Sequence, residues 1–271
     1  ITFLSATVYT NSVFGGEGGS FDTSLGVVST PEYGKVFIAI ESTTGNNLTA
    51  TEKSTLISAL SPFTVASITP VIVDPQTTNL ILGVNFLFDS SKTTETTTSL
   101  ASKINTTLTS YNTTDLAQFD GAFRHSKVTG LIDDTDTAIT SNITTVTLAH
   151  NLTPTLNAST SYTIQLNNRF SNPHTEHNKA AGGILASTGF KVSGDATNVQ
   201  FFDDDGAGNI RRYILVAGVR QYQDNTAGTI TYSTGEIKIN NVNITSVEEV
   251  DEVASTFIRL TVTPDSLDVV P

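Results

Sequence analysis

The chain has 271 residues, a formal net charge of -12 and a charged fraction of 15%, against about 25% in a typical soluble protein. An acidic chain repels nucleic acid and anionic membranes, so we expect neither as a partner. It has no cysteine, which excludes disulfides and thiolate metal sites. The frequent Thr, Ser and Asn residues favour strands and turns, so a β-rich protein is predicted. A chain of this length typically folds as two modest domains.

Residues 1–34 are expected to form an entering strand followed by a glycine-rich loop. Residues 1–9 alternate apolar and polar side chains, which is typical of a strand. The glycine cluster at residues 14–19 has no helical pattern behind it, so it favours a flexible loop over a phosphate-binding one. Because the chain begins at Ile1 and not at Met, we expect a fragment or a processed product.

Strand and helix patterns alternate regularly only in residues 35–157, which we expect to be one α+β domain. Residues 35–40 form a short apolar run that predicts a strand. Thr49 and Glu52 then form a capping box, in which each side chain satisfies a free backbone donor of the other residue. Pro62 ends the helix that begins there.

Two further strands are predicted at residues 65–73 and 80–88, and the second has an apolar side chain at every second position. A second helix follows, with a buried stripe spaced four, four and three residues apart. The stripe consists of Leu100, Ile104, Leu108 and Tyr111. The apolar run in residues 80–88 is too short to span a bilayer.

A short helix at residues 123–132 and a closing strand at residues 139–148 complete this domain. The apolar pattern of the closing strand changes phase between Ile143 and Val146, which predicts a β-bulge near Thr144 or Thr145. The order of these elements, βαββαβ, fits a ferredoxin-like split βαβ unit.

Residues 158–271 lack helical patterns and are expected to form a small antiparallel β-rich domain, so the fold class is α+β. Strands are predicted at residues 162–166, 199–202, 211–219, 228–232, 236–240 and 256–262. A tight hairpin is predicted around Ser233, Thr234 and Gly235.

One acidic turn in this domain resembles a calcium loop, because calcium binds hard oxygen ligands carried on glycine turns. An EF-hand would need a Glu about twelve positions from its first ligand, where this chain has Leu215. A solvated hairpin turn is therefore favoured. A calcium turn formed by Asp203, Asp205 and Asn209 is the weak alternative.

No catalytic constellation is apparent, so we expect neither an enzyme nor a bound cofactor. His174, Glu176 and His177 lie closer together than the helical spacing of zinc hydrolases, which favours a solvated loop over a metal site. The acidic residues at 133–136 end the short helix without a nucleophile or an orienting base beside them.

Four cations stand out in this acidic chain, namely Arg124, Lys127, Arg211 and Arg212. Two interpretations remain open for them. They either pair with an acidic patch on a neighbouring subunit, which makes them interface candidates, or they form ion pairs within the chain.

Several short motifs are similar, in their order and spacing, to one family. They are Phe37-Ile38-Ala39-Ile40, Pro70-Val71-Ile72-Val73-Asp74-Pro75, Phe123-Arg124-His125-Ser126-Lys127, Leu152-Thr153-Pro154-Thr155-Leu156-Asn157 and Gly228-Thr229-Ile230-Thr231-Tyr232-Ser233-Thr234-Gly235. In these motifs, which extend over nearly the whole chain, the sequence resembles the C-terminal portion of the baseplate wedge ring subunit of T-even-type contractile-tailed phages, in the baseplate-J-like group.

The resemblance implies a structural virion protein, assembled in the host cytoplasm and located in the tail baseplate. Such subunits form homodimers and link neighbouring wedges into a ring around the tail hub, which relays the trigger for sheath contraction. The implied partners are copies of the chain and other wedge proteins. The residues alone leave an alternative open: an extracellular or virion-surface β-rich adhesin or surface-layer module, stabilised by calcium.

Overall fold

The computed structural model describes residues 2–10, 20–22, 27–30, 35–40, 48–63, 69–73, 76–117, 121–172 and 183–269. Its helices are α1 (Ala50–Leu60), α2 (Thr97–Tyr111) and α3 (His125–Asp133), with a 3-10 turn (Ser61–Phe63) and a π-helical turn (Asn112–Leu116). The first strands are β1 (Thr2–Thr10), β2 (Ser20–Asp22), β3 (Val27–Thr30), β4 (Lys35–Ala39), β5 (Thr69–Val73), β6 (Gln76–Phe88) and β7 (Ile139–Leu152). The later strands are β8 (Ser159–Gln165), β9 (Leu185–Ser187), β10 (Phe190–Val192), β11 (Asp195–Asp204), β12 (Asn209–Val216), β13 (Val219–Thr231), β14 (Glu236–Val247) and β15 (Ile258–Val262).

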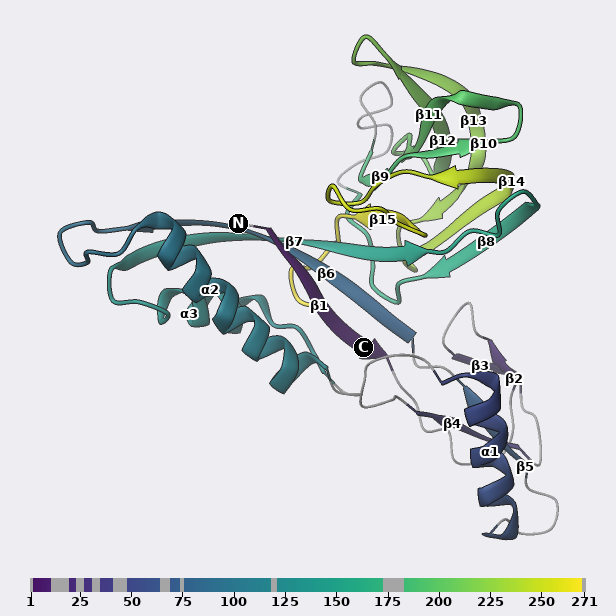
Figure 1. Ribbon diagram of the computed structural model, residues 1–271, viewed down its shortest axis with the longest axis horizontal. Coiled ribbons are helices and arrows are strands. Elements are labelled where there is room, and N and C mark those ends of the chain that lie inside the picture. Colours follow the sequence, from purple (N-terminus) through teal and green to yellow (C-terminus); the bar gives the residue numbers. More distant parts are fainter. Residues whose placement is uncertain are drawn as a thin grey trace.

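Helix α1 connects two parallel strands, β4 and β5, which form a small sheet of their own (Figure 1). The predicted capping box is present at its first turn. The Thr49 hydroxyl accepts a hydrogen bond from the Glu52 backbone N–H at 3.3 Å, and the Glu52 carboxylate accepts one from the Thr49 N–H at 2.8 Å. The box therefore determines where this helix begins.

Strands β6 and β7 belong to a different, eleven-stranded sheet. No pairing joins them to β4 or β5 among the residues that the structure describes. In a ferredoxin-like unit, β4, β5, β6 and β7 would all belong to one sheet. The ferredoxin-like arrangement therefore stays a prediction.

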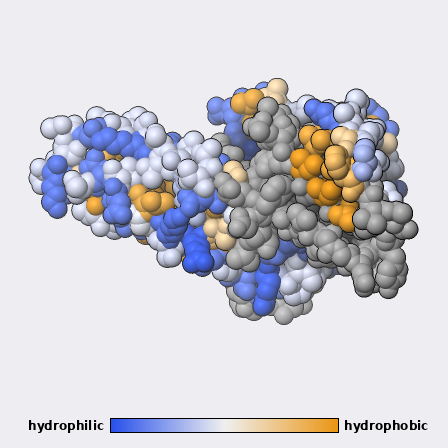
Figure 2. Space-filling model, turned by 90° about the horizontal axis from the view of Figure 1, so that it is seen from below, coloured by the Kyte–Doolittle hydropathy of each residue, from blue (hydrophilic) through white to orange (hydrophobic). Residues whose placement is uncertain are grey.

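The long antiparallel ribbon of β6 and β7 carries α2 and α3 beside it and projects from the rest of the molecule (Figure 1). We call β6, β7, α2 and α3 the arm. The predicted stripe of α2 is fully buried, with Leu100 and Ile104 at 0% exposure. Leu82 and Val84 alternate with less buried positions on β6 and are also buried. Figure 2 shows that mainly hydrophilic side chains, with isolated hydrophobic ones, cover the face of the arm visible in that view.

The prediction of a β-bulge near Thr144 or Thr145 is wrong. Strands β6 and β7 pair in regular register through Thr144 and Thr145, and the register shifts only between Leu87 and Phe88, near the end of the arm. The apolar pattern changes phase because Thr144 occupies a buried position, while Ile143 points outward with 69% exposure. A buried Thr144 beside an exposed Ile143 thus gives the same apolar pattern in the sequence as a β-bulge would.

Five strands close into an antiparallel barrel. In order around the barrel, β10 pairs with β11, β11 with β12, β12 with β13, β13 with β14, and β14 again with β10. Strand β8 extends β14, while β9 links β11 to β15, which pairs with β7 of the arm. Hydrogen-bonded pairing therefore continues from the arm into the barrel.

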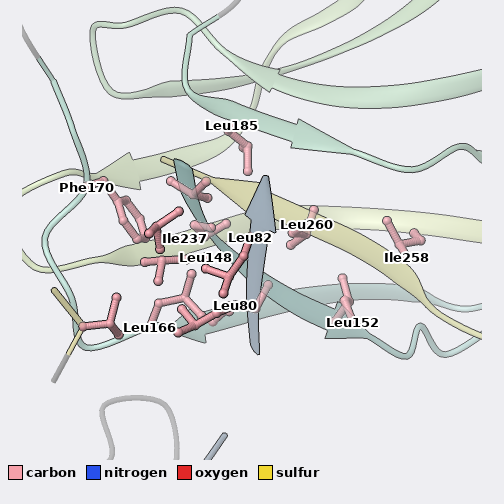
Figure 3. Close-up of a cluster of buried hydrophobic side chains, with 14 of the residues drawn as sticks. Leu80, Leu82, Leu148, Leu152, Leu166, Phe170, Leu185, Ile237, Ile258 and Leu260 are labelled. Atoms are coloured by element: carbon pink, nitrogen blue, oxygen red, sulfur yellow. The ribbon is translucent and has the colours of Figure 1, made fainter. Parts of the chain in front are cut away.

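One hydrophobic core also runs through both parts. Figure 3 shows Leu82 of β6 and Leu148 of β7 close to Leu185, Ile237 and Leu260, which come from β9, β14 and β15. All five side chains are at most 3% exposed. Because packed interiors have low compressibility and transmit strain, the arm and the barrel are expected to behave as one body.

Candidate interaction surfaces and the buried charge cluster

A cluster of charged and phenolic side chains lies on one face of the barrel strands β11, β12 and β13. Asp203, which is 1% exposed, accepts hydrogen bonds from Arg211 Nε at 2.9 Å and Arg211 Nη2 at 3.2 Å. It also accepts hydrogen bonds from Arg220 Nη1 at 2.9 Å and from the Tyr222 hydroxyl at 3.0 Å. One carboxylate therefore connects three neighbouring strands.

The charged groups of this cluster interact with one another within the chain. Burial raises the pKa of the Asp203 carboxyl, while the hydrogen bonds and charge of Arg211 act against that rise. Burial and the neighbouring Asp203 charge also raise the pKa of Tyr222. The Arg211 guanidinium lies 4.1 Å from the centre of the Tyr222 ring, in a cation–π contact. The cluster thus holds strands together and presents no free acid or base.

The neighbouring Asp204 ties the end of β11 to β9 and β13. Its Oδ1 accepts the backbone N–H of Leu185 at 2.8 Å, and its Oδ2 accepts the Tyr232 hydroxyl at 2.6 Å. Burial, followed by the hydrogen bond to Asp204, raises the pKa of Tyr232. This second carboxylate is therefore also occupied within the chain.

The three residues of the weak calcium alternative are hydrogen-bonded within the chain, and a calcium turn there stays a prediction. Asp205 accepts hydrogen bonds from the Ala207 and Asn209 backbone N–H groups at 2.8 and 3.0 Å, and from Asn209 Nδ2 at 2.8 Å. Burial disfavours its charged form, but these hydrogen bonds outweigh burial and lower the pKa of Asp205. Asp203 is held by the two arginines. Within the described part of the chain, no three His, Asp or Glu side chains form a metal-binding group.

The structure separates the four interface candidates into two pairs. Arg211 and Arg212 lie on β12 of the barrel, and Arg211 is buried against Asp203. Arg212 donates a hydrogen bond to Gln200 Oε1 at 2.5 Å and lines a cavity of about 130 Å³ together with Asp224. Arg211 therefore forms an ion pair within the chain. An interface role for Arg212 stays a prediction.

Arg124 and Lys127 lie at the start of α3 on the arm. Lys127 forms an ion pair with Asp115 and lies 5.1 Å from the centre of the Tyr111 ring. Arg124 is exposed, and no ion pair joins it to another described residue. An interface role for both residues stays a prediction, and Arg124 is the more available of the two.

The remaining sequence candidates have structural contacts or lie outside the described residues. His174, Glu176 and His177 lie outside them. At the end of α3, the Asp133 carboxylate accepts a hydrogen bond from Asn142 Nδ2 at 2.7 Å, and Asp136 pairs with Lys103 at 3.0 Å. The acidic helix end thus anchors α3 to β7 and α2.

His150 lies on β7, and from the sequence it is expected to be a packing or surface residue and not part of a site. Burial lowers its pKa below 6.5. The unfolded chain therefore takes up the proton first as the pH falls, so the stability present above about pH 6.5 is lost below it. We expect the melting temperature to fall more between pH 7.5 and 5.5 in the wild type than in His150→Gln. Equal pH dependence of the two proteins, measured by calorimetry, would contradict this.

The outer face of the arm exposes two large apolar side chains. Leu87 and Ile143 are both 69% exposed, and they are diagonal neighbours because Asn85 pairs with Ile143 and Leu87 with Ser141.

No helix among the described residues is long and apolar enough to cross a membrane.

Comparison with known families gives two matches, to different domains of one protein. Residues 5–73 match the family described as baseplate structural protein gp6, C-terminal domain I. Residues 82–151, which form most of the arm, match baseplate structural protein gp6, C-terminal domain III. No curated protein matches the chain. The family indicates a structural role in the virion tail, assembled with other baseplate proteins. The two matches identify the chain as a phage baseplate structural protein.

Proposed function

We propose that the chain is a baseplate wedge subunit of the baseplate-J-like type. In this role it associates with copies of itself, links neighbouring wedges into a ring around the tail hub, and relays the trigger for sheath contraction. The proposal rests on the two domain matches and on the motifs that resemble the wedge ring subunit.

The observation that supports a relay most directly is the continuous core between the arm and the barrel. Leu80 and Leu82 of the arm belong to the same buried cluster as Ile237 and Leu260. Strand pairing between β7 and β15 reinforces this connection. A displacement applied to one end would therefore move the other end, because close-packed interiors have low compressibility and transmit strain.

A ring subunit also needs exposed surfaces at separate places, since each copy must touch two neighbours. The arm offers Arg124 and the outward pair Leu87 and Ile143. The barrel separately exposes apolar residues on the hairpin between β12 and β13, a surface open to other baseplate proteins. Mutation in either region should affect assembly before it affects folding.

The solution mass of the purified full-length protein tests self-association. We expect light scattering to give the mass of a dimer or a larger ring fragment at micromolar concentration. Arg124→Glu should shift the equilibrium toward monomer by a few-fold, because exposed charges contribute at most about 1 kcal/mol. Arg169→Glu is the control, since Arg169 is exposed but lies 3.7 Å from Asp265 within the chain. A wild type that stays monomeric at high concentration would rule out the ring-subunit role.

A further inference from the structure

The hairpin that joins β12 and β13 ends in a tip of exposed apolar residues. We call residues 215–219 the hairpin tip. Leu215, Val216 and Val219 are 51%, 43% and 66% exposed, and Ala217 is exposed between them. A Cβ added to Gly218 would meet no atom within 4 Å, so the space beside this glycine is open. The tip is therefore an apolar projection into solvent.

The backbone of the tip favours polar residues, and this chain does not have them. Val216 pairs with Val219, which leaves Ala217 and Gly218 as a two-residue turn with φ of +51° and +80°. Positive φ at both central residues defines a type I′ turn, for which Asn-Gly is the preferred sequence. Among the described residues, the other non-glycine positions with positive φ are Asn157, Asn167, Asp251 and Glu252.

Ala217 is thus the one apolar residue with positive φ among the described non-glycine residues. An L-residue with a Cβ and no polar side chain is strained there, whereas Asn relieves the strain by local hydrogen bonding. In this chain the strained position contains Ala and not Asn, so the tip is apolar. The apolar side chains of the tip are exposed in the free chain. Exposed apolar surface of this kind is typical of a protein–protein contact.

The base of the hairpin is held rigidly. Arg220, directly below the tip, bonds to Asp203 and lies 4.8 Å from the centre of the Tyr213 ring. Tyr213 in turn stacks on Phe201 with ring centres 5.5 Å apart. A projection fixed in this way loses little conformational entropy on binding, which favours its use as a preorganised anchor.

We propose that the hairpin tip inserts into an apolar pocket on a different protein of the baseplate. The proposal rests on the assembly role proposed above. A stable protein interface of any kind needs about 800 Å² from each partner, and the four apolar side chains of the tip supply only part of that area, so tip-to-tip pairing of two copies alone would not suffice. A convex tip also requires a concave partner, so tip-to-tip pairing of two copies does not bury it.

Two cavities among the described residues do not suit the tip either. One, of about 130 Å³, lies beside Arg212 and Asp224, and the other, of about 310 Å³, lies beside Arg169 and Asp265. Charged side chains line both, and burying them against valine would leave those charges desolvated. The observations therefore favour a non-identical partner over a second copy.

A polar but well-formed tip provides the first test. The triple variant Val216→Thr, Ala217→Asn and Val219→Thr keeps the β-branched shape and installs the preferred Asn-Gly turn. We expect a melting temperature equal to or higher than that of the wild type, and at least tenfold less incorporation into tails made by a phage that lacks the native gene. Val253→Thr is the matched control, because Val253 is also 66% exposed but follows the polar turn at Asp251. It should assemble normally.

Protection of the tip in assembled tails provides the second test. The chain has no cysteine, so Val216→Cys gives one reactive thiol. Maleimide should label it in the free protein and fail to label it in tails. Photo-cross-linking from a benzoylphenylalanine introduced in place of Val219 should then give a product with another baseplate protein.

The possible outcomes separate the two proposals. If the wild type never enters tails, the assembly role itself fails. If the wild type enters tails but the thiol of the Val216→Cys variant remains reactive there, or the triple variant assembles normally, the docking proposal fails alone. A cross-link to a second copy of this chain overturns the choice of partner.

Discussion

Replacing Asp203 by Asn is expected to lower the free energy of unfolding by about 3–5 kcal/mol, because removing one partner of a buried ion group leaves uncompensated charge. The neutral amide would remove the carboxylate that pairs with buried Arg211 at 2.9 Å and with Arg220 at 2.9 Å. Since these side chains connect β11, β12 and β13, the barrel should lose stability as a whole. Denaturant unfolding followed by circular dichroism measures the change.

The control for this variant is Asp265→Asn. Asp265 pairs with Arg169 at 3.7 Å, but both side chains are at least half exposed. Exposed pairs contribute at most about 1 kcal/mol, so this variant should unfold almost as the wild type does. If Asp203→Asn were no more destabilising than Asp265→Asn, the cluster could not be holding the barrel together.

Replacing Leu148 by Ala is expected to cost about 2–5 kcal/mol, the usual range for removing a fully buried leucine. Leu148 is 0% exposed and lies where the arm meets the barrel strands (Figure 3). Because one core continues through both parts, the loss should reduce hydrogen-exchange protection in β6 and β7 and also in β12 and β14.

Ile143→Ala on the same strand serves as the control, since Ile143 is 69% exposed. Its effect on stability should stay within about 0.5 kcal/mol. Loss of protection confined to the arm in Leu148→Ala would show that the arm and the barrel open independently. That result would remove the physical basis of the proposed relay.

Local rules predicted the helices and most strands of the chain. The capping box at Thr49 and the stripe from Leu100 to Tyr111 both have the predicted structure, because they depend on contacts within a few residues. Closure of the barrel could not be predicted in the same way. It depends on the pairing of β10 with β14 and of β11 with β12, and alternating patterns do not specify partners that are distant in sequence.

Two errors came from residues that contradict their local pattern. The turn at Ala217 divides the predicted strand 211–219, and it lacked the Asn or Asp that would have marked it. The predicted hairpin turn is present between β11 and β12, but Asp203 beside it is buried and not solvated. A hairpin centred on Ala207 would have placed Asp203 opposite Arg211, so a cross-strand ion pair was available as a signal.

Electron microscopy of the intact tail would show whether copies of this chain form the ring. We expect many copies around the hub, each touching two neighbours in a closed ring. The arm and the barrel should move together, as one body, between the resting and contracted tails. Copies that do not touch one another, or absence of the chain from the baseplate, would contradict the account.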